Sequence, residues 1–223
     1  MQRYIDACVR SGDATRIEKA LDTIITTPAL HARFVNTLAR MEYVGVRKLL
    51  KSRRAEHLDL EGLQHMLDEN VHALRLKKAA TALGAPLGVA VTTFSDEHTL
   101  AGDAGEEYLQ ALDRRAESEL ADLAESQRAE VNVLMTTAAI EVRAQVFYPL
   151  YDRRLAAHHA GFSVALITKD EDRHLADVGR GLERQLTDWR PRFDRLMEAE
   201  TTLFRAFFDE VDAAVASANA RAA

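Results

Sequence analysis

The chain has 223 residues, of which 47% are hydrophobic and 29% are charged, so it can bury a sizeable core and is not expected to be disordered. Its formal net charge of -6 argues against a dedicated nucleic-acid-binding protein, because such proteins need a basic surface to neutralise phosphates. The single cysteine excludes an intrachain disulfide, and without a signal-peptide core or a run of roughly 20 apolar residues the sequence predicts a cytoplasmic protein that does not enter a membrane.

Helical sequence begins near the N-terminus. Ala, Leu, Arg and Glu dominate the chain, which has only 10 glycines and 4 prolines. A first helix is expected to end at Ser11-Gly12, and Asp13 can cap a second helix that runs to about Thr26. Thr27-Pro28, an N-cap residue followed by proline at the first helical position, begins a third helix that continues through Leu50.

A polar, turn-like stretch from Ser52 to Leu58 separates this helix from the next. Asp59 can cap the next helix, and Gly84-Ala85-Pro86 stops it. Residues 84–105 contain glycines, a proline and the sequence VAVTTF, so we expect a crossover loop that can include a short extended piece.

The helical pattern then resumes near Glu106 and continues to about Ala157. Roughly fifty residues of straight helix would span roughly 75 Å, which is too long for one compact domain. We therefore expect a break or bend near Ala124–Ala129, and we expect Pro149 to kink the second part near its end.

Two further helices complete the chain. A turn at residues 158–161 leads to a helix from Ser163 to about Leu186, and Pro191 begins the last helix. Glu200 interrupts the apolar face of the last helix, and we expect its side chain to reach the surface rather than a buried position. The apolar residues of this face, which must pack on another element, are Phe193, Leu196, Leu203, Phe207 and Val211.

Two copies of a Glu-x-x-His motif lie on predicted helices, at Glu69–His72 and Glu171–His174. Positions i and i+3 share a helix face, so each pair can point at one metal ion, although a single such motif arises easily by chance. Each motif is preceded along the chain by a lone glutamate on an otherwise apolar face, Glu42 and Glu141. Burying a carboxylate is costly unless it is paired or bound to a metal, so these glutamates strengthen the prediction of a metal site.

The geometry of helical hairpins gives a third indication that these residues form one metal site. In an antiparallel pair, residues equidistant from the turn lie at the same height. The midpoint between Glu42 and Glu69 is Ala55-Glu56, inside the first predicted turn, and the midpoint between Glu141 and Glu171 is Ala156, close to the second. Both hairpins therefore bring a glutamate level with a Glu-x-x-His motif.

The order Glu…Glu-x-x-His, found twice and separated by a crossover, resembles the ferritin-like di-metal carboxylate superfamily, which includes rubrerythrins, ferritins, acyl carrier protein desaturases and a tRNA hydroxylase. The resemblance covers residues 28 to about 186. It implies an all-α fold, a ferritin-like antiparallel four-helix bundle with a long crossover and extra N- and C-terminal helices. We interpret residues 1–223 as a single domain, with N-terminal helices at 1–27, the metal-binding four-helix bundle at 28–186 and a C-terminal helix at 187–223.

The resemblance also implies how the motif residues bind two metal ions. Carboxylate oxygens with imidazole favour two Fe ions, with Mn as the alternative. A metal-free bundle remains the competing interpretation, because most glutamates on helices are solvated. The implied ligands are Glu42 and Glu141 as single ligands, Glu69 and Glu171 as bridging carboxylates, and His72 and His174 as terminal ligands.

For three other residues near the motifs, the sequence allows either a position beside the site or a position at the surface. Asp68 and Asp170 lie four residues before the two histidines and either accept hydrogen bonds from the imidazoles or face solvent. His65, one turn before Glu69, lies either beside the site or on the exposed surface.

Small residues near the ligands, Gly45, Ala138 and Ala144, predict space for a substrate, although they equally allow close helix packing. Thr137 and Gln145, one turn either side of Glu141, are candidate catalytic residues that can hydrogen-bond a metal-bound oxygen species. These features favour a non-haem di-iron oxidoreductase that uses dioxygen or peroxide to oxidise or hydroxylate a small organic substrate, with an external reductase and a homodimer among its expected partners.

Two other functional classes stay open. The first is a ferroxidase or peroxide scavenger of the rubrerythrin type, or an iron-handling protein, although the chain lacks the Cys-x-x-Cys pairs of a rubredoxin-like domain. The second is a helical interaction protein without catalysis, which metal analysis would distinguish from the other two.

Overall fold

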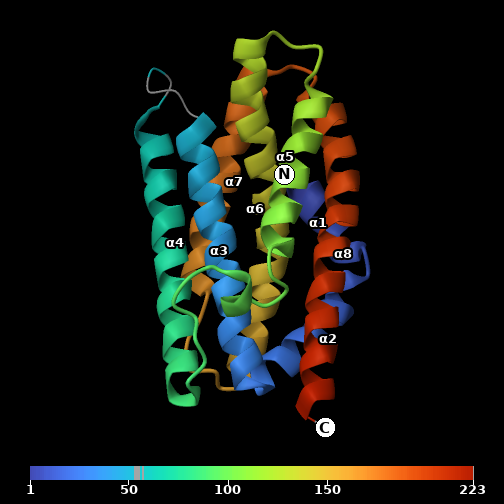
Figure 1. The fold of residues 1–223 in the computed structure, drawn as a ribbon. Coiled ribbons are helices and arrows are strands. Elements are labelled where there is room, and N and C mark those ends of the chain that lie inside the picture. Colours follow the sequence, from blue (N-terminus) through green and yellow to red (C-terminus); the bar gives the residue numbers. More distant parts are fainter. Residues whose placement is uncertain (53–55, 57, 223) are drawn as a thin grey trace.

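The computed structural model describes residues 1–52, 56 and 58–222 of the chain (Figure 1). This part is all-helical, as the composition predicted, and contains no β-strand. Its α-helices are α1 (Gln2–Arg10), α2 (Asp13–Thr26), α3 (Pro28–Ser52), α4 (Leu60–Gly84), α5 (Ala104–Glu119), α6 (Glu125–Ala157), α7 (Ala165–Gln185) and α8 (Trp189–Ala222).

Most helix ends lie where local chemistry predicts them. Asp59 caps α4, because its side chain accepts a hydrogen bond from the Gly62 amide at 2.9 Å. Pro28 begins α3, and Pro191 lies in the first turn of α8. At the start of α2, however, the N-cap is Gly12 with a φ of 80°, and Asp13 is already the first helical residue, so the predicted Asp13 cap is wrong.

The first predicted turn lies between the end of α3 at Ser52 and the N-cap of α4. Its midpoint residue Ala55 lies outside the described residues, as do residues 53, 54 and 57.

The crossover between α4 and α5 contains two short 3-10 helices, η2 (Ala85–Leu87) and η3 (Asp96–His98), and no extended strand among its residues. Side chains from the two neighbouring helices satisfy its carbonyl groups instead. The Asn36 amide donates to the carbonyls of Thr93 and His98 at 2.9 and 2.8 Å. The ammonium group of Lys77 donates to the Asn36 side chain at 2.7 Å and to the Thr93 carbonyl at 3.0 Å. The loop is therefore held without a β-ladder.

The break in the long helical region falls at residues 120–124, slightly before the predicted position, because α5 ends at Glu119 and α6 begins at Glu125. Leu120 is fully buried, so the turn is fixed by a core side chain. Pro149 lies inside α6, which continues to Ala157.

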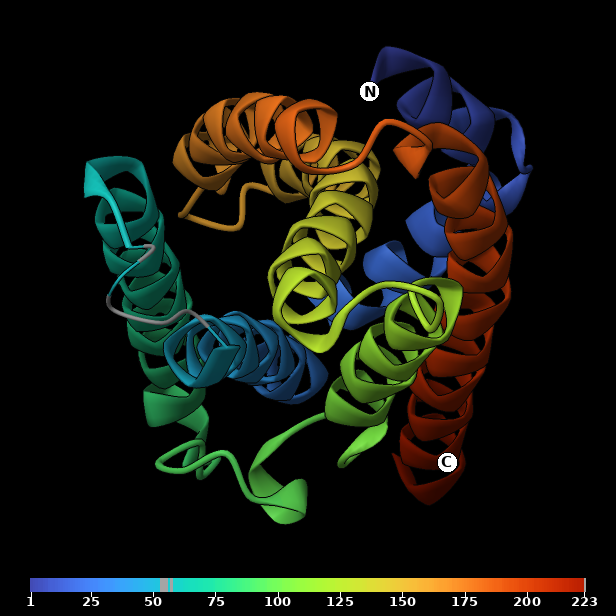
Figure 2. The same cartoon turned by 90° about the horizontal axis from the view of Figure 1, so that it is seen from above.

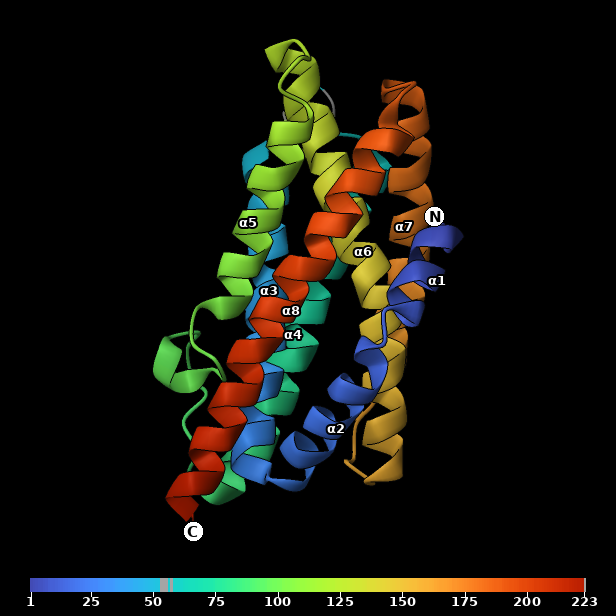
Figure 3. The ribbon, with the colours of Figure 1, turned by 90° about the vertical axis from the view of Figure 1, so that its right-hand side faces the viewer.

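The helices pack mainly in pairs, α3 with α4, α6 with α7, and α5 with α8 (Figure 1). Seen from above, α6 lies near the middle, with α3, α5, α7 and α8 around it and α4 at the outer edge (Figure 2). From the side, α8 runs along α5, while α2 crosses beside α6 (Figure 3). The apolar face of α8 is buried in this arrangement, with Phe193 and Val211 fully buried. The assignment of residues 1–223 to one domain stays a prediction.

A buried histidine of α3 gives the fold a specific acid sensitivity. His31 is 2% exposed, its Nε2 lies 2.8 Å from the Tyr151 hydroxyl, and burial lowers its pKa from 6.5 to about 4. Between these pH values the unfolded chain binds a proton that the folded chain does not bind. Stability should therefore fall as the pH falls from 6.5 to about 4.

We predict that, over this pH range, the free energy of unfolding of His31→Gln falls by about 3 kcal/mol less than that of the wild type. Urea unfolding of both proteins at neutral pH and near the lower end of the window measures it, and all other titrating groups are common to the pair. Parallel loss of stability in wild type and variant would contradict the assignment.

Candidate metal centre

Seven acidic and histidine side chains converge in the interior between α3, α4, α6 and α7. None of these side chains exposes more than 10% of its surface. They form two groups, and within each group the potential ligand atoms all lie within 4.8 Å of one another. The first group is His65, Glu69, Glu141 and His174, and the second is Glu42, Glu69, His72 and Glu171.

The structure thus brings together all six predicted ligand residues and adds His65. On α4, residues 65, 69 and 72 lie at i, i+4 and i+7, so one face of one helix presents all three side chains. Gly45 of α3 faces them, and a Cβ atom at this position would lie 3.4 Å from Glu69 Oε2. The missing side chain leaves room for the carboxylate that both groups share.

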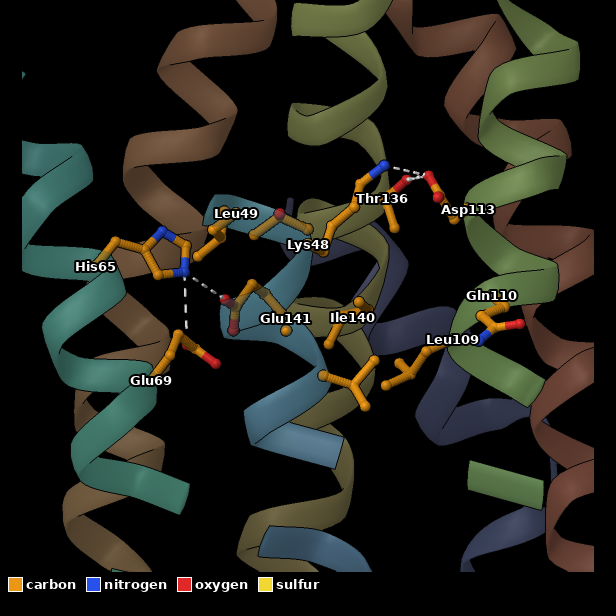
Figure 4. A pocket seen from close by; sticks show the side chains of 13 residues that line it. Lys48, Leu49, His65, Glu69, Leu109, Gln110, Asp113, Thr136, Ile140 and Glu141 are labelled. Atoms are coloured by element: carbon orange, nitrogen blue, oxygen red, sulfur yellow. Dashed lines mark hydrogen bonds and ion pairs between the residues drawn. The ribbon is translucent and has the colours of Figure 1, made fainter. Parts of the chain in front are cut away.

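In the first group, two parallel imidazoles face two carboxylates. The rings of His65 and His174 stack with centroids 3.9 Å apart. His65 Nε2 lies 3.5 Å from Glu69 Oε1 and 3.5 Å from Glu141 Oε1 (Figure 4). His174 Nδ1 lies 3.4 Å from Glu69 Oε1 and 3.6 Å from Glu141 Oε1. These nitrogen and oxygen atoms surround one small space.

In the second group, a single imidazole faces three carboxylates. His72 Nδ1 lies 3.3 Å from Glu171 Oε1, 3.9 Å from Glu42 Oε2 and 4.0 Å from Glu69 Oε1. Tyr148 of α6 donates a hydrogen bond to Glu42 Oε1. Burial raises the pKa of Tyr148 well above 10, so this hydroxyl keeps its proton and holds the carboxylate in place.

The Nε2 atom of each motif histidine, which faces away from the carboxylates, contacts an aspartate that lies beside the other motif in the sequence. His72 Nε2 lies 3.2 Å from Asp170 Oδ2, and His174 Nε2 lies 3.3 Å from Asp68 Oδ2. Each aspartate therefore serves the histidine of the other motif, and Arg173 pairs with Asp68. An Nε2–H that donates to an aspartate keeps Nδ1 turned toward the carboxylates, where it could bind a metal ion once its own proton is released.

We predict that Asp68→Ala weakens metal binding about 10- to 100-fold, because the His174 ring loses its orienting acceptor. Competition titration of Mn(II) against a chelator measures the change. Asp172→Ala, at an exposed position of α7, is the matched control and should bind as wild type does. Equal affinities for Asp68→Ala and this control would show that the crosswise contact does not orient a ligand.

The electrostatics of the cluster are those of an acidic site that attracts cations. Burial, and then the charges of Glu69 and Glu171, raise the pKa of Glu42 well above its usual value. Burial alone would lower the pKa of His65, but the nearby carboxylates of Glu141 and Glu69 raise it to about 9. The crowded carboxylates thus hold protons on neighbouring groups, and a bound cation can replace those protons.

Three buried ligand-type atoms, Glu69 Oε1, His72 Nδ1 and Glu141 Oε2, have no hydrogen-bond partner in the described part of the chain. An unsatisfied buried polar group costs about 1–3 kcal/mol, and all three belong to the two groups. A cation would satisfy them together. Oxygen-rich donors with imidazole and no thiolate suit a hard or borderline divalent metal, so the residues present fit a metal ion.

A largely apolar pocket of about 700 Å³, including its open mouth, reaches the cluster from the side of α5 and α8. Gly45 and Ala144 line it, as their small size predicted, but Ala138 is fully buried in the core and lines neither this pocket nor the next. Its remaining wall is formed by the four glutamates and by apolar or aromatic side chains including Leu38, Met41, Phe147, Phe204 and Phe207.

A second pocket of about 580 Å³, again with its mouth, reaches Glu69 and Glu141 between α3, α5 and α6 (Figure 4). Thr137 lines this second pocket, as does Ile140, which also lines the first. Gln145, the other candidate catalytic residue, lines neither pocket. Its amide donates to the Thr168 carbonyl of α7 at 3.2 Å.

A buried ion pair supports the wall of the first pocket. Arg143 of α6 binds both oxygens of Glu200 at 2.8 and 2.7 Å, and the Tyr108 hydroxyl donates to Glu200 at 2.9 Å. Glu200 is 0% exposed, so the prediction that its side chain reaches the surface is wrong. Its partners lie on α5 and α6, and neither spacing nor periodicity within α8 reveals them.

Comparisons with family models, curated proteins and solved structures find no match to this chain. Within the described residues, every helix is too short or too polar to cross a membrane.

Proposed function

We propose that this chain is a ferritin-like di-metal protein whose helices α3, α4, α6 and α7 form an antiparallel four-helix bundle around two Fe ions, with Mn as the alternative metal. In this proposal it is an oxidoreductase that uses dioxygen or peroxide to oxidise or hydroxylate a small organic molecule. One observation carries the proposal: two ligand groups share Glu69 and adjoin a largely apolar pocket.

The ligands divide between the two ions according to the two groups. One ion would take Glu141, His174 and His65, and the other would take Glu42, His72 and Glu171. Glu69 would be shared, since it belongs to both groups. Glu171, the other carboxylate predicted to bridge, could be shared as well, because its two oxygens lie 3.3 Å from His72 Nδ1 and 3.1 Å from His174 Nδ1. Each ion would then have at least four protein ligands, with Glu69 counted for both, which leaves coordination positions open for an oxidant.

When bound, two adjacent redox-active ions supply two electrons to an oxidant together. The protein's own residues prepare the surroundings. Asp68 and Asp170 orient the imidazoles, and Tyr148 fixes one oxygen of Glu42. Phe147, with the apolar residues around it, binds the organic molecule and excludes water. Thr137 lines the second pocket, where its hydroxyl could donate to a polar group beside Glu141.

The character of the pocket favours an organic substrate over iron cargo. A path for iron needs carboxylates along its length, whereas here the acidic groups are confined to the inner end and the wall beyond them is mainly aliphatic and aromatic. A substitution that fills this pocket should therefore reduce oxidation of a substrate without reducing metal binding.

We predict that Ala144→Phe lowers oxidation of an apolar probe at least about 10-fold while metal content stays unchanged, because an aromatic ring fills the pocket and every ligand side chain is retained. The assay combines Fe(II)-loaded protein, dioxygen, ascorbate and a set of probes such as indole and p-cresol, with products measured by mass spectrometry.

Ala129→Phe, at an exposed position of the same helix, is the matched control. An apolar-pocket oxidase gives probe oxidation in the wild type and control and little in Ala144→Phe. A hollow shell that oxidises and stores many irons per chain, with no probe product, would replace this proposal with the iron-handling alternative.

A further inference from the structure

Helix α4 carries exposed leucines on the side opposite the metal centre. Leu60, Leu63, Leu67 and Leu74, called here the leucine ridge, are 80%, 50%, 57% and 53% exposed. Scattered exposed leucines are ordinary, but the ridge positions repeat at intervals of 3, 4 and 7 residues and so form one stripe along the helix. A helix of a folded chain buries such a stripe against a neighbour.

No helix of the described chain covers the ridge. The face of α4 that bears Glu69 and His72 points inward, and α4 packs chiefly on α3, with few contacts to α7. Both the front view and the view from above place α4 at the outer edge of the molecule (Figures 1 and 2). The ridge therefore faces outward.

The charges along the ridge select its partner and orientation. The exposed acidic residues Glu56 and Asp59 lie just before its N-terminal end, and the exposed basic residues Arg75 and Lys78 lie at its C-terminal end. A parallel second helix would set like charges against each other, while an antiparallel copy sets each acidic end against a basic end.

We propose that the leucine ridge is the interface of a two-fold symmetric homodimer, in which α4 packs antiparallel on α4 of a second copy. With the axis near Leu67, Leu60 of one copy faces Leu74 of the other, and Arg75 faces Asp59. Such an isologous contact closes on itself and buries the whole stripe in both subunits. It also braces α4, which holds three residues of the metal centre but is supported mainly by α3.

Sedimentation equilibrium of the full-length protein at about 100 µM tests the interface, since a standard-sized contact gives a dimer at this concentration. Leu67→Glu should raise the dimer dissociation constant at least about 30-fold, as expected for a charge at the centre of an interface. Leu166→Glu alters an equally exposed leucine outside the ridge, on α7, and should leave the dimer intact. Circular dichroism checks that both variants fold.

Crosslinking tests the orientation in a Cys8→Ala background. A mixture of Leu60→Cys and Leu74→Cys proteins should form disulfide-linked heterodimers, whereas Leu60→Cys alone should not crosslink. A wild-type monomer, a dimer that Leu67→Glu leaves unchanged, or efficient crosslinking of Leu60→Cys alone would each overturn the proposal. None of these readouts depends on metal or catalysis, so they stand apart from the proposed function.

Discussion

Glu69→Ala should abolish binding of both metal ions while the protein stays folded. Glu69 is the only residue that belongs to both ligand groups, so its loss removes a donor from each ion at once. Removing one of the buried carboxylates also relieves repulsion among those that remain, and the metal-free helices should lose little stability. Elemental analysis after anaerobic reconstitution with Fe(II), together with circular dichroism, measures the two effects.

The division of the ligands into two groups predicts a different metal content for variants of the other ligands. Glu141 belongs to only one group, so Glu141→Ala should retain about one ion per chain. Glu61→Ala changes an exposed glutamate of the same helix as Glu69 and should bind metal as wild type does. If Glu69→Ala kept two tightly bound ions, the shared-carboxylate arrangement would be wrong.

Arg143→Met should destabilise the fold by about 3–5 kcal/mol, because it leaves Glu200 charged and buried without its cation. Urea denaturation at neutral pH, followed by circular dichroism, gives the change in the free energy of unfolding. Because Arg143 also lines the apolar pocket, we expect a looser pocket wall in this variant.

The double variant Arg143→Met/Glu200→Met separates a lost ion pair from lost packing. Replacing both charges by apolar side chains removes the uncompensated carboxylate, so the double variant should be more stable than Arg143→Met alone. A double variant less stable than the single one would mean that the methionine introduced in place of Arg143, rather than the unpaired Glu200, causes the damage.

Much of the fold was predictable because local signals and hairpin geometry agreed. Asp59 and Pro28 mark helix starts through their own side chains, whatever the rest of the chain does. The ligand positions followed from two periodicities. Positions i and i+3 place Glu69 and His72 on one face, and equal distance from a turn places Glu42 at the same height.

The remaining features depend on which helix lies beside which, and one sequence does not contain that information. The partner of Glu200 is Arg143, on a helix distant in sequence. The face of α8 alone therefore predicted that the Glu200 side chain reaches solvent, whereas the structure places it in a buried ion pair. The crosswise aspartates were foreseen only as neighbours of the histidines on their own helices, whereas Asp68 reaches His174 of the other motif. His65 had a usable signal in its i, i+4 relation to Glu69, which extends the ligand stripe by one turn.

Anomalous X-ray diffraction at the iron absorption edge, on crystals of Fe(II)-reconstituted protein, tests the two-ion centre most directly. Two peaks per chain, about 3.5–4 Å apart, are expected. One should lie among His65, Glu141 and His174, the other among Glu42, His72 and Glu171, with Glu69 between them. Crystals of fully reconstituted protein with no anomalous peak among these side chains, or with iron bound only elsewhere, would contradict the two-ion centre.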